Sequence, residues 1–304
     1  MDIASNNLKH PNTPRPHLNM HKMEQNHVEI VRQWCINEGW NLGLHDAKIY
    51  LQIDPNGHFI LFDKEEPIGS ISLVRHRDDF FTIGPFIVKP EYREKGHGVF
   101  IWDKAMSRLN DLLNPSILLY AVEAQVNRYR NLGFNMQHKN LKWELNQKAY
   151  KAAKPTVPCT FLTPDVINII SEYDKHIFTA SREKIITELL TYPDINGFFV
   201  WADNKIKGYG LIRPCILGNR IGPLFADSKE IAKSIIGALL QHSGAENVVI
   251  DMPESNKEGV LLMTELEAKH NQKSDTIAMV KGQLSPEYNH NIGKNFGIFS
   301  LEIG

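Results

Sequence analysis

The amino-acid sequence predicts an α+β fold that occurs twice along the chain, each copy a mixed, mostly antiparallel sheet flanked by helices. Three strand-like runs at residues 58–62, 68–74 and 80–88 are joined by tight turns, which is typical of an antiparallel meander. Apolar residues at helical spacing follow between residues 98 and 113, and a further strand-like run occupies residues 117–122. The same order of elements then recurs later in the chain.

An internal repeat supports the prediction of two units. Ile83-Gly84-Pro85 in the first unit and Ile221-Gly222-Pro223 in the second follow an arginine at the same spacing. In both units a helical segment and then a strand come next; a chance likeness between two meanders is the alternative explanation. We therefore expect a disordered tail at residues 1–18, a first unit at 19–148, a Lys-, Ala- and Pro-rich linker at 149–159 and a second unit at 160–304.

Composition argues against several functional classes. The 304 residues carry a formal net charge of −1, whereas a surface that binds nucleic acid needs an excess of Lys and Arg. The three cysteines are far apart and the thirteen histidines show no metal-ligand spacing, so we predict neither a disulfide framework nor a metal site. No apolar run is long enough for a membrane helix, and the N-terminal residues lack the apolar centre of a signal peptide. We expect a cytoplasmic protein without a membrane or nucleic-acid partner; the sequence does not indicate an oligomeric state.

The clearest chemical signal is the segment at residues 88–98, which has the pattern V-x-P-x-x-R-x-x-G-x-G between a strand and a helix. Gly96 and Gly98 allow a tight turn and a close approach of the backbone to a ligand. The unpaired N–H groups at the start of a helix attract a pyrophosphate, and Arg93 and Lys95 add cationic donors. A dinucleotide-binding G-x-G-x-x-G fails at Ile101, and the Lys-Ser or Lys-Thr of a P-loop is absent.

This segment resembles the acetyl-CoA-binding motif of the GNAT (GCN5-related N-acetyltransferase) superfamily. The stretch from Gln125 to Phe134, with Tyr129 four residues before Gly133, is similar to a second GNAT signature. The segments at residues 221–227 and 250–256 resemble a GNAT subgroup that carries a second, C-terminal GNAT-like domain. The resemblance covers nearly the whole chain after about residue 20, and it implies tandem GNAT folds in which the first unit is catalytic and the second is degenerate.

The resemblance implies an acetyl-CoA-dependent N-acetyltransferase that acts on a primary amine of a small molecule, with acetyl-CoA as co-substrate and no metal. The end of the third strand, the loop and helix start that follow it, and one amide side chain are then expected to bind the co-substrate through Phe86, Ile87, Val88, Arg93, Glu94, Lys95, Gly96, His97, Gly98, Val99 and Asn127. Glu94 must point away from the pyrophosphate, while His97 either donates to a phosphate or faces solvent. A helix-surface role is the alternative for Asn127.

The resemblance makes Tyr129 the expected general acid that protonates the leaving thiolate, with simple packing under the loop as the alternative. The general base cannot be read from the sequence. Glu123 is the nearest candidate, Asp46 and His45 come next, and Asp251 and Glu254 either line an acceptor pocket or cap a loop. The second unit lacks the glycine motif, so we expect that it does not bind CoA in the same manner. The alternatives to a small-molecule enzyme are an acyl-CoA-binding regulatory module and a protein or peptide N-acetyltransferase.

Overall fold

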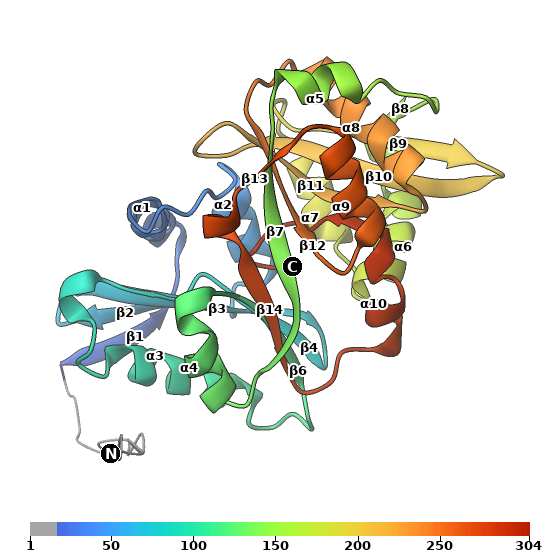
Figure 1. The fold of residues 1–304 in the computed structure, drawn as a ribbon. Helices are drawn as coiled ribbons and strands as arrows, with labels where there is room; N and C mark the ends of the chain where they lie inside the picture. Colours follow the sequence, from blue (N-terminus) through green and yellow to red (C-terminus); the bar gives the residue numbers. More distant parts are fainter. Residues whose placement is uncertain (1–16) are drawn as a thin grey trace, which may run out of the picture.

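The strands of both units join edge to edge in one sheet (Figure 1). The computed structural model describes residues 17–304. The strand order is β1-β2-β3-β4-β6-β14-β7-β12-β11-β10-β9-β8, and β5, β13 and β15 pair with β3, β7 and β11. The strand bounds are β1 Leu18–Lys22, β2 His58–Asp63, β3 Glu66–Arg77, β4 Phe80–Ile83, β5 Ile87–Val88, β6 Ser116–Val122, β7 Asn135–Leu145, β8 Thr160–Phe161, β9 Asn196–Ala202, β10 Lys205–Pro214, β11 Asn219–Ala226, β12 Val248–Pro253, β13 Lys269–His270, β14 Thr276–Lys281 and β15 Asn295–Gly297.

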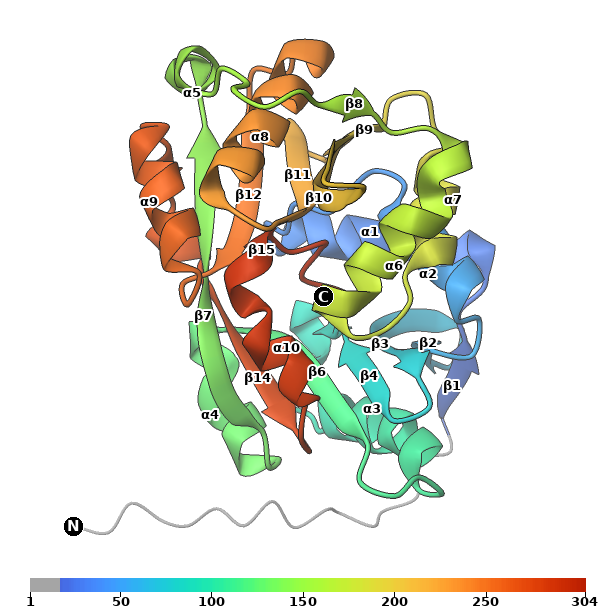
Figure 2. The same cartoon turned by 90° about the vertical axis from the view of Figure 1, so that its right-hand side faces the viewer.

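Helices cover both faces of this sheet (Figures 1 and 2). Their bounds are α1 Val28–Asn37, α2 Asp46–Ile53, α3 His97–Met106, α4 Val126–Asn131, α5 Gln147–Ala152, α6 Ile167–Phe178, α7 Glu183–Leu189, α8 Lys229–Ser243, α9 Lys257–Glu265 and α10 Pro286–His290. In α3, the buried residues Ile101, Trp102 and Ala105 lie at helical spacing and pack against β3, and α8 packs in the same way against β10. The predicted α+β fold with a mixed, mostly antiparallel sheet is therefore confirmed.

The internal repeat corresponds to a repeat of structure. In the first unit β2, β3 and β4 form an antiparallel meander, α3 follows, and β6 then pairs with β4 in parallel. In the second unit β9, β10 and β11 form the meander, α8 follows, and β12 pairs with β11 in parallel. Each unit thus has a helix between the third strand of its meander and a strand that pairs with it in parallel.

The third predicted strand, residues 80–88, is broken in two. Residues 80–83 form β4 between β3 and β6, whereas β5 at residues 87–88 pairs with β3 alone. Gly84 and Pro85 lie at the break; Pro85 has no N–H to donate, so it cannot continue the ladder. The break sends the chain away from β6 and opens a space between them.

The two units exchange strands. β14 belongs to the second unit by sequence but lies between β6 and β7 of the first. β7 is long enough to serve both units: residues 135–140 pair with β14, and residues 140–145 pair with β12 (Figure 2). The boundaries of 19–148, 149–159 and 160–304 stay a prediction, and strand pairing crosses them; α5 lies partly inside the expected linker. The predicted tail lies outside the described residues except for residues 17 and 18, and Leu18 already begins β1.

Candidate functional site

A cleft opens where β4 and β6 part. The two strands pair in parallel from Phe80↔Ser116 to Ile83↔Leu119, beyond which β5 follows β3 and β6 stays with β14. We call the space between residues 84–88 and residues 119–122 the first wedge. It belongs to a cavity of about 270 Å³ that is lined on this side by residues 83–86 and 119–122, Gln125 and Tyr129.

Backbone direction in β5 decides which groups face the first wedge. Lys89 N–H donates to Ile68 O at 2.9 Å. Because hydrogen-bonded and non-hydrogen-bonded pairs alternate in an antiparallel ladder, the Ile87–Ser70 pair is also bonded and Val88 N–H points away from β3, toward the wedge. Ile87 therefore uses its backbone on β3 and buries its side chain, so Phe86 and Val88, but not Ile87, can offer backbone N–H groups to a ligand in the wedge.

The glycine loop ends at the open N-terminus of α3. Gly96 is the N-cap residue with φ of 78°, a left-handed conformation that glycine adopts without strain, and no side chain caps the helix. The N–H groups of residues 97–99 consequently lack partners within the helix. Glu94 is exposed and also has a positive φ, of 61°. The loop has the features of an anion site, as the sequence predicts.

The cations expected at the loop have other partners. Arg93 donates from Nε to Val88 O at 2.8 Å and pairs with Glu38, and Lys95 Nζ donates to Glu91 O at 2.7 Å. Arg128 of α4 is the cation that reaches the helix mouth. A Cβ on Gly98 would lie 3.0 Å from Nη2 of Arg128, whose guanidinium also lies 5.4 Å from the centroid of the Phe86 ring. Sequence analysis missed this residue, although it stands between two residues of the second motif, Asn127 and Tyr129.

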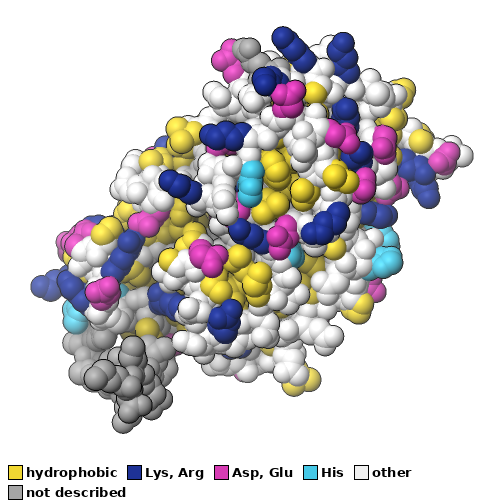
Figure 3. Space-filling model, viewed as in Figure 1, with side chains coloured by type: hydrophobic (Ala, Val, Ile, Leu, Met, Phe, Trp, Pro, Cys, Tyr) yellow, Lys and Arg dark blue, Asp and Glu magenta, His cyan; other side chains and the backbone are white. Residues whose placement is uncertain are grey.

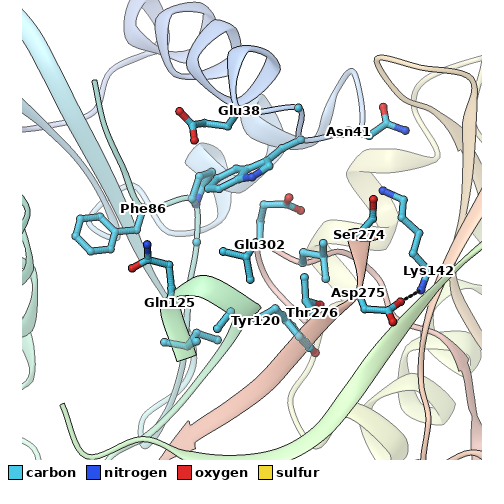
Figure 4. A pocket seen from close by; sticks show the side chains of 18 of the residues that line it. Glu38, Asn41, Phe86, Tyr120, Gln125, Lys142, Ser274, Asp275, Thr276 and Glu302 are labelled. Atoms are coloured by element: carbon cyan, nitrogen blue, oxygen red, sulfur yellow. Dashed lines mark hydrogen bonds between the residues drawn. The ribbon is translucent and has the colours of Figure 1, made fainter. Parts of the chain in front are cut away.

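Segments from both units line the opposite side of the cavity (Figure 4). They are residues 38–41 after α1, Lys142 on β7, Arg220 on β11, residues 273–276 before and in β14, and Leu301 and Glu302. Charges of both signs are present, and the Thr276 hydroxyl on this wall is buried without a hydrogen-bond partner. The cavity thus joins an apolar slot beside a helix N-terminus to a polar chamber.

Comparison with known proteins identifies this arrangement. Residues 25–134 match the acetyltransferase (GNAT) family model, and residues 170–293 match a second acetyltransferase (GNAT) domain model. The chain belongs to the GNAT superfamily and carries two GNAT-like domains. It is 26% identical over 226 residues to holothin acyltransferase of Pseudoalteromonas sp. (strain SANK 73390). The aligned region covers 74% of this chain and 75% of that protein. The chemistry of the family is acyl transfer from an acyl-CoA.

Solved structures show the same tandem fold. A crystal structure from Pyrococcus horikoshii superposes with a TM-score of 0.78 at 21% identity and covers 97% of this chain and 99% of that one. A tandem GNAT protein from the clavulanic acid biosynthesis pathway gives a TM-score of 0.61 at 12% identity over 88% of this chain and 99% of that one.

Of the eleven residues predicted to bind the co-substrate, Phe86 alone lines the cavity. The side chains of His97 and Asn127 have partners within the protein. His97 is buried, and its Nδ1 lies 2.8 Å from Tyr92 O, to which it donates; the solvent-facing alternative is therefore wrong. Asn127 is exposed, and its side-chain oxygen accepts a hydrogen bond from Arg130 at 2.7 Å. Val99 is partly buried in the first turn of α3. The backbone N–H of Val99 is one of those in that turn that have no partner within the helix.

Tyr129, the predicted general acid, lies in the cavity wall. Its ring packs against Trp102 and Phe134, each with centroids 5.9 Å away. Burial raises the pKa of Tyr129 above its usual range, so the hydroxyl keeps its proton at neutral pH. Among residues 17–304 no side chain or backbone group binds this hydroxyl, which leaves the proton available to a ligand.

The carboxylates and histidine considered as the base lie elsewhere. Glu123 is exposed at the end of β6 and does not line the cavity. Asp46 is buried in a bidentate ion pair with Arg213, and both distances are 3.0 Å. His45 pairs with Asp194 on the surface.

The two acidic residues of the second unit lie away from the cavity as well. Asp251 pairs with Arg220 at 2.6 Å behind the cavity wall. Glu254 follows β12 and is also absent from the lining. Three acidic residues that sequence analysis did not consider do line the cavity: Glu38, Asp275 and Glu302. Glu38 is paired with Arg93, and Asp275 with Lys139 and His270.

The second wedge, between β11 and β12, is filled by the chain itself. β11 and β12 pair only at Asn219↔Val248 and Arg220↔Val249. Beyond this point β15 pairs with β11, and Ile298 N–H donates to Asp251 O at 2.8 Å on the other side. Residues 295–298 thus use the backbone groups that a ligand would need in the second domain.

Within residues 17–304 we find neither a helix suited to cross a membrane nor a group of three His, Cys, Asp or Glu that could hold a metal ion.

Proposed function

We propose that this protein transfers the acetyl group of acetyl-CoA to a primary amine of a small molecule, and that it binds one acetyl-CoA per chain, in the first domain. The observation that carries the proposal is that Phe86, which lines the cavity, also lies beside the uncapped N-terminus of α3, where a Cβ on Gly98 would be 3.6 Å from its ring. Such a slot fits a thin apolar arm that ends in a pyrophosphate. The second domain cannot offer the same slot, because residues 295–298 occupy its wedge.

The residues present fit an acyl-CoA. Backbone N–H groups of α3 and the Arg128 guanidinium would hold the pyrophosphate, and Val88 N–H would bind the arm. Bound there, the co-substrate supplies an electrophilic thioester carbonyl. Phe86 N–H lies at the strand break and is placed to stabilise negative charge on its oxygen. Tyr129 supplies a proton for the departing sulfur.

A small acceptor fits the cavity better than a protein. Residues 273–276, Leu301 and Glu302 of the second unit close the side opposite the wedge, and the volume is about 270 Å³, which lies below the usual range for drug-sized ligands. Figure 3 shows both signs of charge interspersed over one face of the molecule, in place of a one-sign patch for a polyanion.

Two measurements test the proposal. Calorimetry with acetyl-CoA is expected to give one site per chain. Thiol release from acetyl-CoA is then followed with a panel of aliphatic amines, amino acids and peptides. Turnover with a small amine supports the proposal. Binding without turnover on any amine supports a regulatory acyl-CoA-binding module, preference for peptides supports a protein acetyltransferase, and two binding sites per chain contradict the role given to residues 295–298.

A further inference from the structure

One segment connects the two wedges. We call residues 295–304 the closing segment. Its first part, β15, pairs with β11, and Ile298 bonds to β12, so that it is held on both sides in the second wedge. Its later residues, Leu301 and Glu302, line the cavity of the first domain. Figure 1 shows the end of the chain at the centre of the molecule, where the two halves meet.

The repeated Gly-Pro pair marks where the closing segment crosses each unit. A Cβ on Gly222 would collide with the carbonyl oxygen of Ile298, and a Cβ on Gly84 would lie 2.9 Å from Cα of Glu302. Both glycines therefore permit a close backbone approach that any side chain would prevent. The conformation of the closing segment is thus fixed by contacts with both halves.

Polar contacts fix the backbone of Glu302. Ser300 Oγ accepts hydrogen bonds from the N–H groups of Glu302 and Ile303, both at 3.2 Å. The Tyr50 hydroxyl, 3.0 Å from Ser300 Oγ, holds this turn from the side of α2. Arg213 donates to Phe299 O at 2.7 Å and anchors the preceding residues. A carboxylate held this firmly is a better catalytic group than one on a free surface loop.

Glu302 is buried, with 9% of its surface exposed, yet it lines the cavity. Figure 4 shows its carboxylate between the loop that carries Asn41 and the segment of Ser274 and Thr276. Burial raises the pKa of this carboxyl, and the positive charge of Arg220 opposes that shift. A carboxylate with a raised pKa is a stronger base than a solvated one.

The other titratable and charged groups near Glu302 come from every element packed on it. They are Arg32 and Cys35 of α1, Glu38 after it, Asp46 and Tyr50 of α2, His58 of β2, Tyr120 of β6, Tyr129 of α4, Lys142 of β7, Arg220 of β11, and Lys273 and Asp275 before β14. Asp46 is neutralised by Arg213, and Asp275 is paired with Lys139 and His270. Glu302 is consequently the buried carboxylate of the cavity wall that has no direct ion pair among the described residues.

We propose that Glu302 is the catalytic residue that takes a proton from the acceptor ammonium, and that the second domain serves catalysis by holding this residue in the active site of the first. The proposal rests on the function proposed above. In the step, the N–H bond breaks, its electron pair stays on nitrogen, and the proton forms an O–H bond on Glu302. The nitrogen pair then forms the C–N bond at the thioester carbonyl as the C–S bond breaks.

Protons balance over the reaction. The ammonium nitrogen loses two protons on its way to the amide. The thiolate takes a proton from Tyr129, and one of the two nitrogen protons replaces the proton that Tyr129 has lost. The other nitrogen proton passes through Glu302 to solvent. Because a neutral nucleophile needs no proton removed before attack, the contribution of Glu302 depends on the acceptor. This dependence separates a base from a residue that merely supports the fold.

The test compares two acceptors in the full-length chain. Ethylamine is protonated near neutral pH and hydroxylamine is not. We expect Glu302→Gln to lower kcat/KM for ethylamine by about 100-fold or more, the usual contribution of a positioned base, and to change the rate with hydroxylamine much less. The affinity for acetyl-CoA, measured by calorimetry, and the Tm should stay near the wild-type values. Glu258→Gln, on the exposed surface of α9, is the matched control and should leave both rates unchanged.

Each outcome bears on the proposal. An unchanged ethylamine rate in Glu302→Gln, or an equal loss of rate with both acceptors, overturns the proposal. If Glu123→Gln loses the ethylamine rate while Glu302→Gln keeps it, the base is Glu123. If Glu302→Gln does not fold, Glu302→Asp is measured instead, and an unchanged ratio of the two rates again overturns the proposal. A wild-type protein that binds acetyl-CoA but turns over neither of these acceptors nor any amine of the panel overturns the proposed function itself.

Discussion

Replacing Asp46 by Asn should destabilise the protein strongly, because this residue forms a buried ion pair between the two units. Asp46 on α2 contacts Arg213 on β10 through both carboxylate oxygens at 3.0 Å, and each side chain is 1% exposed. Arg213 also donates to Gly222 O and to Phe299 O. The substitution leaves the guanidinium without its counter-charge in a place that water does not reach.

The magnitude follows from that burial. Removing one partner of a buried ion pair costs about 3–5 kcal/mol, since the remaining charge is uncompensated. In domains of somewhat smaller size, a loss of 1 kcal/mol in the free energy of unfolding lowers the Tm by roughly 2–4 °C. Asp46→Asn should therefore lower the Tm by on the order of 10 °C. The free energy of unfolding is measured by urea titration at neutral pH, with circular dichroism as the signal.

Asp194→Asn is the matched control. Asp194 pairs with His45 at 3.0 Å, but its side chain is 47% exposed, and exposed pairs contribute at most about 1 kcal/mol. The reasoning is refuted if Asp46→Asn loses less than about 1 kcal/mol, or if the two variants lose the same amount. Either result would mean that water or a shifted closing segment compensates the Arg213 charge.

Three further predictions concern the first domain. Arg128→Ala should weaken acetyl-CoA binding about 10- to 100-fold in calorimetry, the effect of losing a charged hydrogen bond, whereas Arg130→Ala should not; equal affinities would contradict the phosphate role. Tyr129→Phe should lower kcat by about 100-fold or more with little change in acetyl-CoA affinity, and an unchanged kcat would exclude it as the acid. His58 is buried and neutral, since Nε2 donates to Tyr50 O and burial lowers its pKa to about 4, so its folded pKa lies below the unfolded one. The neutral form of His58 therefore contributes roughly 3 kcal/mol to the free energy of unfolding; this contribution is complete above the unfolded pKa of 6.5 and is lost as pH falls toward 4. His58→Gln should make the free energy of unfolding less dependent on pH between these two values. A dependence as steep as that of the wild type would refute the assignment.

The second domain contributes to the sheet and to the cavity of the first. Its β14 lies between β6 and β7, and its closing segment forms part of the cavity wall. Its own wedge is occupied by β15, which pairs with β11. If the proposed function holds, we expect neither domain to be active when separated from the other.

The sequence by itself determined the features that depend on neighbouring residues. Alternation and turn residues predicted the meanders, and the spacing of apolar residues predicted α3 and α8. The glycine motif predicted an anion site at a helix N-terminus, and the repeated Ile-Gly-Pro predicted two similar units. Each of these signals arises from local backbone preference or from one face of one element. The fold class could therefore be predicted from the sequence, and so could a helix N-terminus with the features of an anion site.

Only the tertiary structure decided which distant segments meet. The sequence pattern does not predict that β14 inserts between β6 and β7, because the alternation of residues in a strand does not specify which strand it pairs with. The break of residues 80–88 into two strands, the position of Arg128 over Gly98 and the arrival of Glu302 at Gly84 depend on contacts between residues far apart in the chain. The residue that we propose as the base could not be found near the third strand. Glu302 comes from a segment about 200 residues later, which backbone pairing in the second wedge holds beside the first domain.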